Sequence, residues 1–427
     1  MAIKIKTFLK NTAKDYHSRS LNPPIVRAST ILFKSHQEIR KIQNLALKNP
    51  SLNYISYGRE GTNTTVKLQN ILKKLENAHH VFLSPTGFGS VHLSILSIVR
   101  PGDELLVTDP VYSPTRLLVG EFLKEFKIKT IFYDPNDIND LKKKISKKTK
   151  ALLIPNLIGN IPDWKGIKEI ASKHKLKIIE DSADTLGATI NNRSTGIYSD
   201  ISITSFYGSH IISCAGNGGM FLTNDKKTYD RAKVLRSWGR MSTLIKDSEN
   251  INKRLDIKLN GYEYDKKFIF SEVGYNFEPS EIGASFGLVQ LKKFKHFSNV
   301  RNRNFKLHYD FFKKLKNYFI VPKIEKNVKT NFLAYPIILK NNVNFSRKKF
   351  QIYLEKNNIQ TRPIFSGNIL RHPAFRNLIS SKNKLNSFKN SDYIMKNGLL
   401  IGCHQGLSKK QIEYIHSKIQ KFLKEVK

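Results

Sequence analysis

The stretch KLKIIEDSADTLGATINNRSTGIYSDISITSFYGSHIISCAGNGGMFLTN, Lys175–Asn224, contains three short β-branched runs separated by turn residues. These runs predict three strands: Lys177–Glu180, Ile201–Phe206 and Met220–Thr223. Asp181 directly follows the first predicted strand, Ser205 lies at the end of the second, and His210 is in the connection that comes next. Because ligands bind outside the carboxyl ends of parallel strands, this stretch predicts a ligand site.

Strand and helix patterns alternate on the N-terminal side of this stretch. The predicted strands are Val81–Leu83, Glu104–Thr108, Thr130–Tyr133 and Ala151–Pro155. The predicted helices are Thr65–Ala78, Ser90–Ile98, Thr115–Phe126, Asp137–Ile145 and Asp163–Lys173. Regular alternation is typical of an α/β protein with a mostly parallel central sheet between helices.

The pattern changes near residue 300. We expect helices at Arg301–Leu315, Arg347–Asn357 and Lys409–Val426, the last capped by Ser408, and strands at Phe332–Leu339 and Thr361–Phe365. The sequence therefore predicts an N-terminal arm (residues 1–60), a large α/β domain (residues 61–295) and a small C-terminal α+β domain (residues 296–427).

Composition restricts the function classes. Lysine and arginine total 73 and aspartate and glutamate 34, so the net charge is +39. We expect no nucleic-acid partner, because the lysines are scattered and no zinc-finger spacing or aromatic RNA-binding motif accompanies them. The two cysteines favour a reducing cytoplasm and no metal centre. The sequence has no apolar run of membrane-spanning length, so no membrane association is expected.

The central stretch resembles the sugar aminotransferase and dehydratase family (DegT/DnrJ/StrS) of fold-type-I pyridoxal phosphate (PLP) enzymes. In that family a Glu-Asp pair, matched by Glu180-Asp181, places its Asp against the pyridinium nitrogen of the cofactor. A Ser-Phe-x-x-x-Lys motif then places Ser on the cofactor phosphate and Lys in a covalent bond with the cofactor. Here the motif reads Ser205-Phe-Tyr-Gly-Ser-His210, so His occupies the Lys position.

This replacement indicates which reaction the residue at position 210 can take part in. An imidazole cannot form the covalent bond that the family's lysine makes with the cofactor, so it can act only as a proton-transfer base. The branch of the family with this replacement comprises 3-dehydratases of nucleotide-linked 4-keto-6-deoxyhexoses, which use free pyridoxamine phosphate (PMP). The resemblance to that branch covers residues 155–427 and includes Arg236–Arg240, Gly274–Leu291 and Thr361–Phe375. It implies Asp184 as a further cofactor residue. It implies three substrate-binding residues: Asn368, Arg371 and His372.

The first 155 residues resemble the cystathionine β-lyase group of the same fold type. In that group a Tyr-Gly-Arg arm, matched by Tyr57 and Arg59, reaches the cofactor phosphate of the neighbouring subunit, and a tyrosine matched by Tyr112 stacks on the cofactor ring. Asn276 likewise resembles a residue that reaches the cofactor phosphate of the neighbour. The resemblance therefore implies a homodimer with shared active sites.

Gly87 and Phe88, in the turn SPTGFGS before a predicted helix, are further candidate cofactor residues. Small residues at this place let backbone amides approach an anion at the helix N-terminus, so the turn predicts a phosphate site. Taken alone, His210 could be a structural histidine and Asp181 a helix N-cap.

Three further functions stay open. The first is a carbon–sulfur lyase, which fits the first half, but no lysine stands at position 210, and Gly402 replaces the arginine that binds the substrate carboxylate in the lyase group. The second is a PLP-dependent sugar aminotransferase, and the third is a cofactor-free binding protein on the same fold. Glutamate is a possible amino donor that would regenerate PMP, and the segment after Trp238 contains no cysteine for an iron–sulfur cluster.

Overall fold

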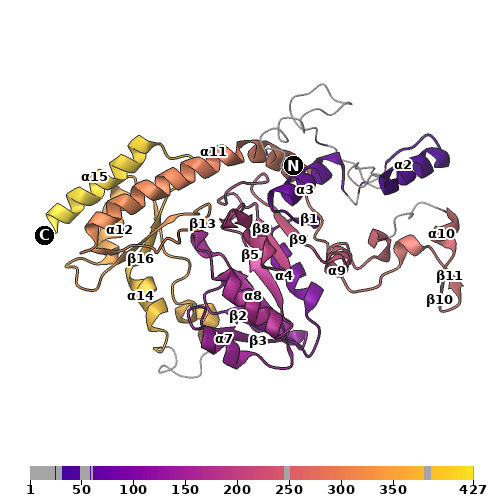
Figure 1. Ribbon diagram of the computed structural model, residues 1–427, viewed down its shortest axis with the longest axis horizontal. Coiled ribbons are helices and arrows are strands. Elements are labelled where there is room, and N and C mark those ends of the chain that lie inside the picture. The colour runs from indigo at the N-terminus through magenta and orange to yellow at the C-terminus, as the bar shows by residue number, and fades with distance from the viewer. Residues whose placement is uncertain are drawn as a thin grey trace.

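Figure 1 shows the computed structural model of the chain, which describes residues 25, 31–48, 58, 61–244, 251–378 and 386–426. Its largest element is a seven-stranded sheet with helices on both faces, and a four-stranded sheet belongs to the C-terminal part. The predicted α/β class with a mostly parallel central sheet is confirmed.

The strands of the large sheet follow the order β1-β9-β8-β5-β4-β2-β3. Their bounds are β1 (His80–Ser84), β2 (Glu104–Thr108), β3 (Lys129–Tyr133), β4 (Thr149–Pro155), β5 (Lys177–Asp181), β8 (Ile201–Ser205) and β9 (Gly219–Thr223). All of these lie close to the predicted strands. Only β9 runs antiparallel to its neighbours, because its connection from β8 contains no crossover helix and the chain turns back beside β8.

Helices cover both faces of this sheet. They are α3 (Asn63–Leu75), α4 (Gly87–Ile98), α5 (Ser113–Leu117), α6 (Leu123–Glu125), α7 (Ile138–Lys144), α8 (Trp164–Lys173) and α9 (Lys226–Arg236). A π-helical turn at Leu118–Phe122 separates α5 from α6 where one helix was predicted. Along β2, Leu105 and Val107 pack under α4 and α9, whereas Leu106 packs under α8. All three are fully buried, at about 1.5–3 kcal/mol each, as expected for an inner parallel strand.

The C-terminal part has its own core. Its antiparallel sheet follows the order β12-β14-β16-β15, with β12 (Phe319–Ile320), β14 (Tyr335–Leu339), β15 (Thr361–Arg362) and β16 (Gly398–Ile401). The helices are α12 (Arg347–Lys356), α14 (Lys389–Asn397) and α15 (Lys409–Glu425). Ser408 caps α15 as predicted, in a reciprocal capping box with Gln411.

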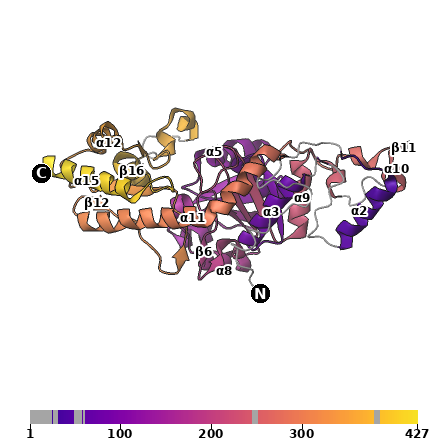
Figure 2. The same ribbon diagram turned by 90° about the horizontal axis from the view of Figure 1, so that it is seen from above.

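One long helix, α11 (Glu281–Phe312), joins the two cores (Figures 1 and 2). Leu288 and Leu291 pack into the core of the large sheet, whereas Phe305 and Phe312 pack into the C-terminal core. The helix begins well before the predicted Arg301, and the proposed domain division between residues 295 and 296 lies inside it. A second link is the small sheet of β6 (Thr189–Ile190), β7 (Arg193–Ser194) and β13 (Val328–Lys329).

Several short elements lie at the end of the molecule away from the C-terminal part, as Figures 1 and 2 show. They are α2 (His36–Lys48), α10 (Ile251–Leu255), β10 (Lys258–Leu259) and β11 (Tyr262–Glu263). Within the described residues, no helix combines the length and the apolar character that a membrane crossing requires.

Candidate functional site

Four connections of the large sheet leave its strands at the same edge. β1, β2, β5 and β8 all run in one direction, so their carboxyl ends lie together. The residues at these ends include Gly87 after β1, Tyr112 after β2, Asp181 at the end of β5 and Ser205 at the end of β8. The fold therefore gathers four of the predicted site residues at one edge, which is where α/β proteins bind ligands.

The corner between α4 and β8 fits a phosphate group. Thr86 caps α4 by accepting a 2.8 Å hydrogen bond from the Gly89 N–H. Gly87 and Phe88 lie in the first turn, where backbone N–H groups have no carbonyl partner within the helix. A Cβ atom added at Gly87 would lie 2.7 Å from the Ser205 Oγ, so only glycine lets the helix approach the serine this closely. N–H groups and a hydroxyl at a helix N-terminus form an anion site.

Asp181 is a buried acid whose charged neighbours are also acids. Burial, with smaller contributions from the charges of Asp184 and Glu180, raises the pKa of Asp181 to about 7. A 3.1 Å hydrogen bond from the Ala183 N–H acts in the opposite direction. A cation beside the carboxylate would remove this penalty, and a protonated pyridinium nitrogen is such a cation. Turns follow Asp181, so it is not a helix N-cap.

Glu180 anchors the end of β5 from the opposite side. Its carboxylate is fully buried and accepts hydrogen bonds from four side chains. The donors are Asn156 (2.8 Å), Ser182 (2.6 Å), Thr195 (2.5 Å) and Ser199 (3.0 Å). Because successive residues of a strand point to opposite faces, this network holds Glu180 on one face and leaves Asp181 on the other.

His210 lies in the loop between β8 and β9 with 16% of its side chain exposed. Its Nδ1 is 3.6 Å from the Asp184 Oδ1 and makes no hydrogen bond within the part of the chain that the structure describes. Burial and, to a smaller extent, the charge of Arg301 lower the pKa of His210 to about 4, while a backbone contact with Ala183 acts in the opposite direction. The imidazole is therefore neutral near pH 7 and can accept a proton, although its pKa lies below the intrinsic value of about 6.5.

Asp184 lies beside His210 and has a second, strained partner. The Ile158 N–H donates a 2.9 Å hydrogen bond to its Oδ2. Ile158 has φ +58°, which a β-branched residue rarely adopts, and such strain is common at functional sites. Burial raises the pKa of Asp184 to about 6, against the hydrogen bond from Ile158 and the charge of Arg301. The sequence suggested Asp184 as a cofactor residue; the contacts that the structure shows for its carboxylate are with His210 and Ile158.

The remaining predicted cofactor residues have different environments. Tyr112 is 50% exposed. The hydroxyl of the adjacent Ser113 lies 2.7 Å from the hydroxyl of Ser366 in the C-terminal part of the chain. Asn276 is exposed and forms an isolated β-bridge with Ser237. Tyr57 and Arg59 lie outside the described residues.

The three predicted substrate residues have protein partners. Asn368 is buried and donates a 2.7 Å hydrogen bond to Asp392, and Arg371 binds both oxygens of the same carboxylate at 2.5 Å each. His372 Nε2 lies 2.9 Å from the carbonyl of Ser366. These contacts hold the segment next to the turn that carries Tyr112, since Ser366 also contacts Ser113.

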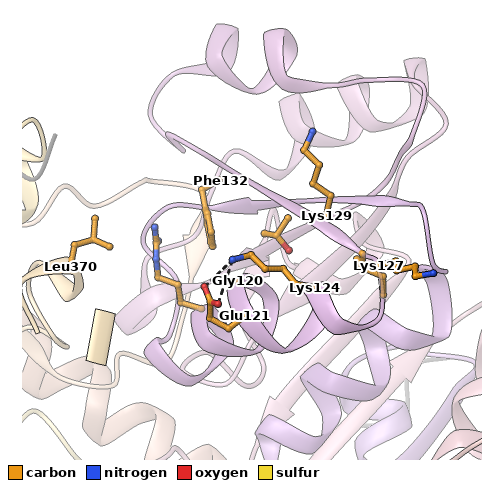
Figure 3. Close-up of a pocket in the computed structure, with 10 residues that line it drawn as sticks. Gly120, Glu121, Lys124, Lys127, Lys129, Phe132 and Leu370 are labelled. Atoms are coloured by element: carbon orange, nitrogen blue, oxygen red, sulfur yellow. Dashed lines mark hydrogen bonds and ion pairs between the residues drawn. The ribbon is translucent and has the colours of Figure 1, made fainter. Parts of the chain in front are cut away.

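A groove of about 510 Å³ runs along β3, the edge strand of the large sheet. Figure 3 shows Lys124, Lys127 and Lys129 around it, with Phe132 and Leu370 toward the other end. Lys124 pairs with Glu121 and Lys129 with Glu104, each through a carboxylate oxygen. The residues that line the groove include neither Asp181 nor His210.

Sequence reasoning missed Arg301, which is 2% exposed and donates to the His210 carbonyl (3.4 Å). One arginine in an amphipathic helix carries no sequence signal for this position. Within the described residues, no group of three or more His, Cys, Asp or Glu side chains could hold a metal ion.

Comparison with known proteins gives concordant matches. The DegT/DnrJ/EryC1/StrS aminotransferase family matches residues 90–420. The chain is 28% identical over 432 residues to dTDP-4-dehydro-2,6-dideoxy-D-glucose 3-dehydratase of Saccharopolyspora spinosa, covering 96% of this chain and 91% of that protein. It is 28% identical over 322 residues to GDP-4-keto-6-deoxy-D-mannose 3-dehydratase of Escherichia coli O55:H7, covering 74% and 80%.

The fold is also similar to a solved structure of E. coli GDP-4-keto-6-deoxy-D-mannose-3-dehydratase with bound hydrated PLP. The TM-score is 0.68 at 24% identity, and the match covers 92% of this chain and 99% of that one. Together these matches confirm the predicted family, the fold-type-I architecture and PLP or PMP as the cofactor of the family. The first relative spans nearly the whole chain, so the similarity is not limited to residues 155–427.

Proposed function

The chain belongs to the DegT/DnrJ/EryC1/StrS aminotransferase family, and we propose that it is a PMP-dependent 3-dehydratase of a nucleotide-linked 4-keto-6-deoxyhexose. The observation that carries this proposal is His210, which stands where the family motif has the lysine that binds the cofactor covalently. Two relatives at 28% identity that are named 3-dehydratases of nucleotide-linked deoxysugars support it.

The residues at the sheet edge fit PMP. When bound, the cofactor supplies an amine that condenses with the C4 ketone of the sugar and a conjugated ring that takes up an electron pair. In this proposal Asp181 balances the charge of the protonated ring nitrogen and thereby relieves its own burial. Ser205 and the N–H groups of Gly87 and Phe88 bind the phosphate, and Tyr112 covers the ring.

His210 performs the proton transfers. Its neutral imidazole accepts the proton from the cofactor carbon that carries the amine, and Asp184 at 3.6 Å stabilises the resulting positive charge. Because burial and Arg301 disfavour the imidazolium, His210 readily returns the proton to the C3 hydroxyl, which leaves as water. The same residue therefore acts first as the base and then as the acid.

The test is to incubate the purified protein with PMP and with GDP- or dTDP-linked 4-keto-6-deoxyhexoses. Nuclear magnetic resonance of the sugar should show loss of the C3 hydroxyl. The variant His210→Asn should still bind PMP but lose roughly 10²–10⁴-fold in rate, the usual cost of removing a general base. His404→Asn is the matched control, because desolvation and the charge of Arg301 also lower the pKa of His404, yet this exposed residue has no place in the proposed proton path. Full activity of His210→Asn would contradict the proposal.

The variant His210→Lys tests the position independently of turnover. A lysine at 210 should bind PLP covalently, and mass spectrometry after borohydride reduction should locate the cofactor on residue 210. Dehydration should fall, since a lysine bound to the cofactor is not a free base. A wild-type protein with PLP attached to another lysine would also overturn the assignment.

The dimer, the amino donor and the location in the cell are proposals of the same kind. We propose that Tyr57, Arg59 and Asn276 reach the cofactor phosphate of a second copy, and that glutamate regenerates PMP. If glutamate fails to sustain turnover, the sugar aminotransferase-like regeneration is wrong. A cytoplasmic location stays a prediction from the low cysteine content.

A further inference from the structure

Arg301 connects four segments that are distant in the sequence. It lies on α11, the helix shared by both cores, and only 2% of it is exposed. Its Nε donates to the Gln405 Oε1 (2.7 Å), and its Nη1 donates to the carbonyls of Phe332 (3.0 Å) and Leu333 (3.2 Å). Its Nη2 donates to the carbonyl of His210 (3.4 Å). One planar group thus ties the loop of His210 to the C-terminal domain.

All four acceptors of Arg301 are neutral. Burying a guanidinium against amide and carbonyl oxygens, without a carboxylate in direct contact, is costly compared with an apolar residue of similar volume. Burial accordingly lowers the pKa of Arg301, while Asp184 and Cys403 act in the opposite direction. An arginine at this position adds little to stability, so its geometry and charge point to a role in placing the His210 loop.

We propose that Arg301 is a positioning residue for His210, which fixes the loop of the base to the C-terminal domain and holds a positive charge beside the imidazole. This inference rests on the proposed function of His210. It adds a residue that acts through the base and does not touch the reacting atoms.

Two physical effects follow from this arrangement. The hydrogen bond to the His210 carbonyl fixes the loop backbone, and at 3.4 Å it is the longest of the four, so a small shift of the C-terminal domain would break it first. Burial is the main cause of the low pKa of His210, and the charge of Arg301 acts in the same direction, so both favour the neutral imidazole. The other titratable groups that face the imidazole are Asp184, at 3.6 Å, and Tyr207, whose ring centroid is 6.3 Å away.

The test compares Arg301→Gln with Arg301→Lys, and Arg303→Gln serves as the matched control. Arg303 lies on the same helix and also donates to a carbonyl of the C-terminal domain, that of Leu407 (3.1 Å), but it does not contact His210. The pKa of His210 is measured in the cofactor-free proteins by following the nitrogen-15 signals of the imidazoles as the pH changes. The signal that is absent from His210→Asn belongs to His210, so the measurement needs no turnover.

In Arg301→Gln the pKa of His210 should rise because the neighbouring cation is gone, but it should stay below the ordinary value of about 6.5 because burial, the larger cause of the low pKa, remains. In Arg301→Lys the charge remains, so the pKa should stay low. Both variants should lower kcat by about 10–100-fold, since misplacing a catalytic group by about 1 Å has an effect of this size. The affinity for PMP and the KM for the sugar should not change, and Arg303→Gln should match the wild type throughout.

An unchanged titration of His210 together with an unchanged kcat in Arg301→Gln would overturn the inference. If that variant does not fold, Gln405→Leu tests the positioning role instead. It removes the oxygen that accepts the hydrogen bond from the Arg301 Nε, and it leaves the charge of Arg301 in place. A lower kcat with an unaltered pKa of His210 supports the positioning role, and wild-type kcat contradicts it. If the wild type does not dehydrate any sugar, the proposed function fails, whereas the titrations still report whether Arg301 acts on His210.

Discussion

The substitution Asp181→Asn separates two effects of the buried Asp181 carboxylate: the loss of stability that its charge causes in the cofactor-free protein, and its contribution to PMP binding. The ordinary pKa of 3.8 applies in the unfolded chain, and burial raises the value to about 7 in the folded protein. A group whose folded pKa is raised stabilises the fold least at high pH, so the cofactor-free protein loses stability as the pH rises from about 4 to about 7. The difference between these two pKa values corresponds to roughly 4 kcal/mol at pH 8 as an upper limit.

We therefore expect cofactor-free Asp181→Asn to be more stable than the wild type at pH 8 and equal to it near pH 4. Urea unfolding at the two pH values, followed by circular dichroism, measures the difference. PMP should stabilise the wild type at pH 8 but have much less effect on Asp181→Asn, because an amide cannot balance the ring nitrogen.

Glu76→Gln provides the matched control. Burial raises the pKa of Glu76 to about 7 as well, and its carboxylate accepts from the Gly187 N–H and the Ser194 hydroxyl, away from the predicted cofactor residues. This variant should reproduce the gain in stability at pH 8 while the affinity for PMP stays as in the wild type. If Asp181→Asn shows no gain at pH 8, or binds PMP as tightly as the wild type does, the reasoning is wrong.

Two further predictions concern the cofactor phosphate. Gly87→Ala should weaken PMP binding, measured by fluorescence titration, because the added Cβ would lie 2.7 Å from the Ser205 Oγ. Gly120→Ala is the control: the atom nearest to its added Cβ would be 4.0 Å away on Phe132, so PMP binding should not change. Light scattering should give twice the 49.1 kDa mass of the chain, and a monomer with full PMP affinity would contradict the shared site.

The inner strands of the large sheet were predictable from sequence because they are short apolar runs buried on both faces. Met220 and Leu222 are examples: they pack into the core beneath α3 and α11, and the pattern placed β9 correctly although not its direction. The first half of α11 was missed because Gly283 and Gly287 weaken a helical pattern. Tertiary packing requires these glycines, since a Cβ atom at Gly287 would lie 2.5 Å from the Cys214 Sγ.

The strand pattern by itself placed a candidate residue only where that residue lies next to a strand end. Asp181 and Ser205 are in that position, so their place at the sheet edge followed from the pattern. The partners of Arg301 and Asp184 come from distant segments: Gln405 is 104 residues from Arg301, and Ile158 is 26 residues from Asp184. Their contacts depend on how α11 and the strained turn at Ile158 pack against the loop of His210, which local patterns do not encode.

The surroundings of position 210 explain how one residue could decide between two chemistries in this fold. Burial and Arg301 disfavour a positive charge at this position. For histidine they ensure a neutral imidazole that can accept a proton. For lysine the same environment would lower the pKa of the ammonium and favour the neutral amine that attacks a carbonyl. This environment therefore suits either residue electrostatically, and a lysine amine at position 210 would hold the cofactor covalently, whereas a histidine imidazole leaves it free.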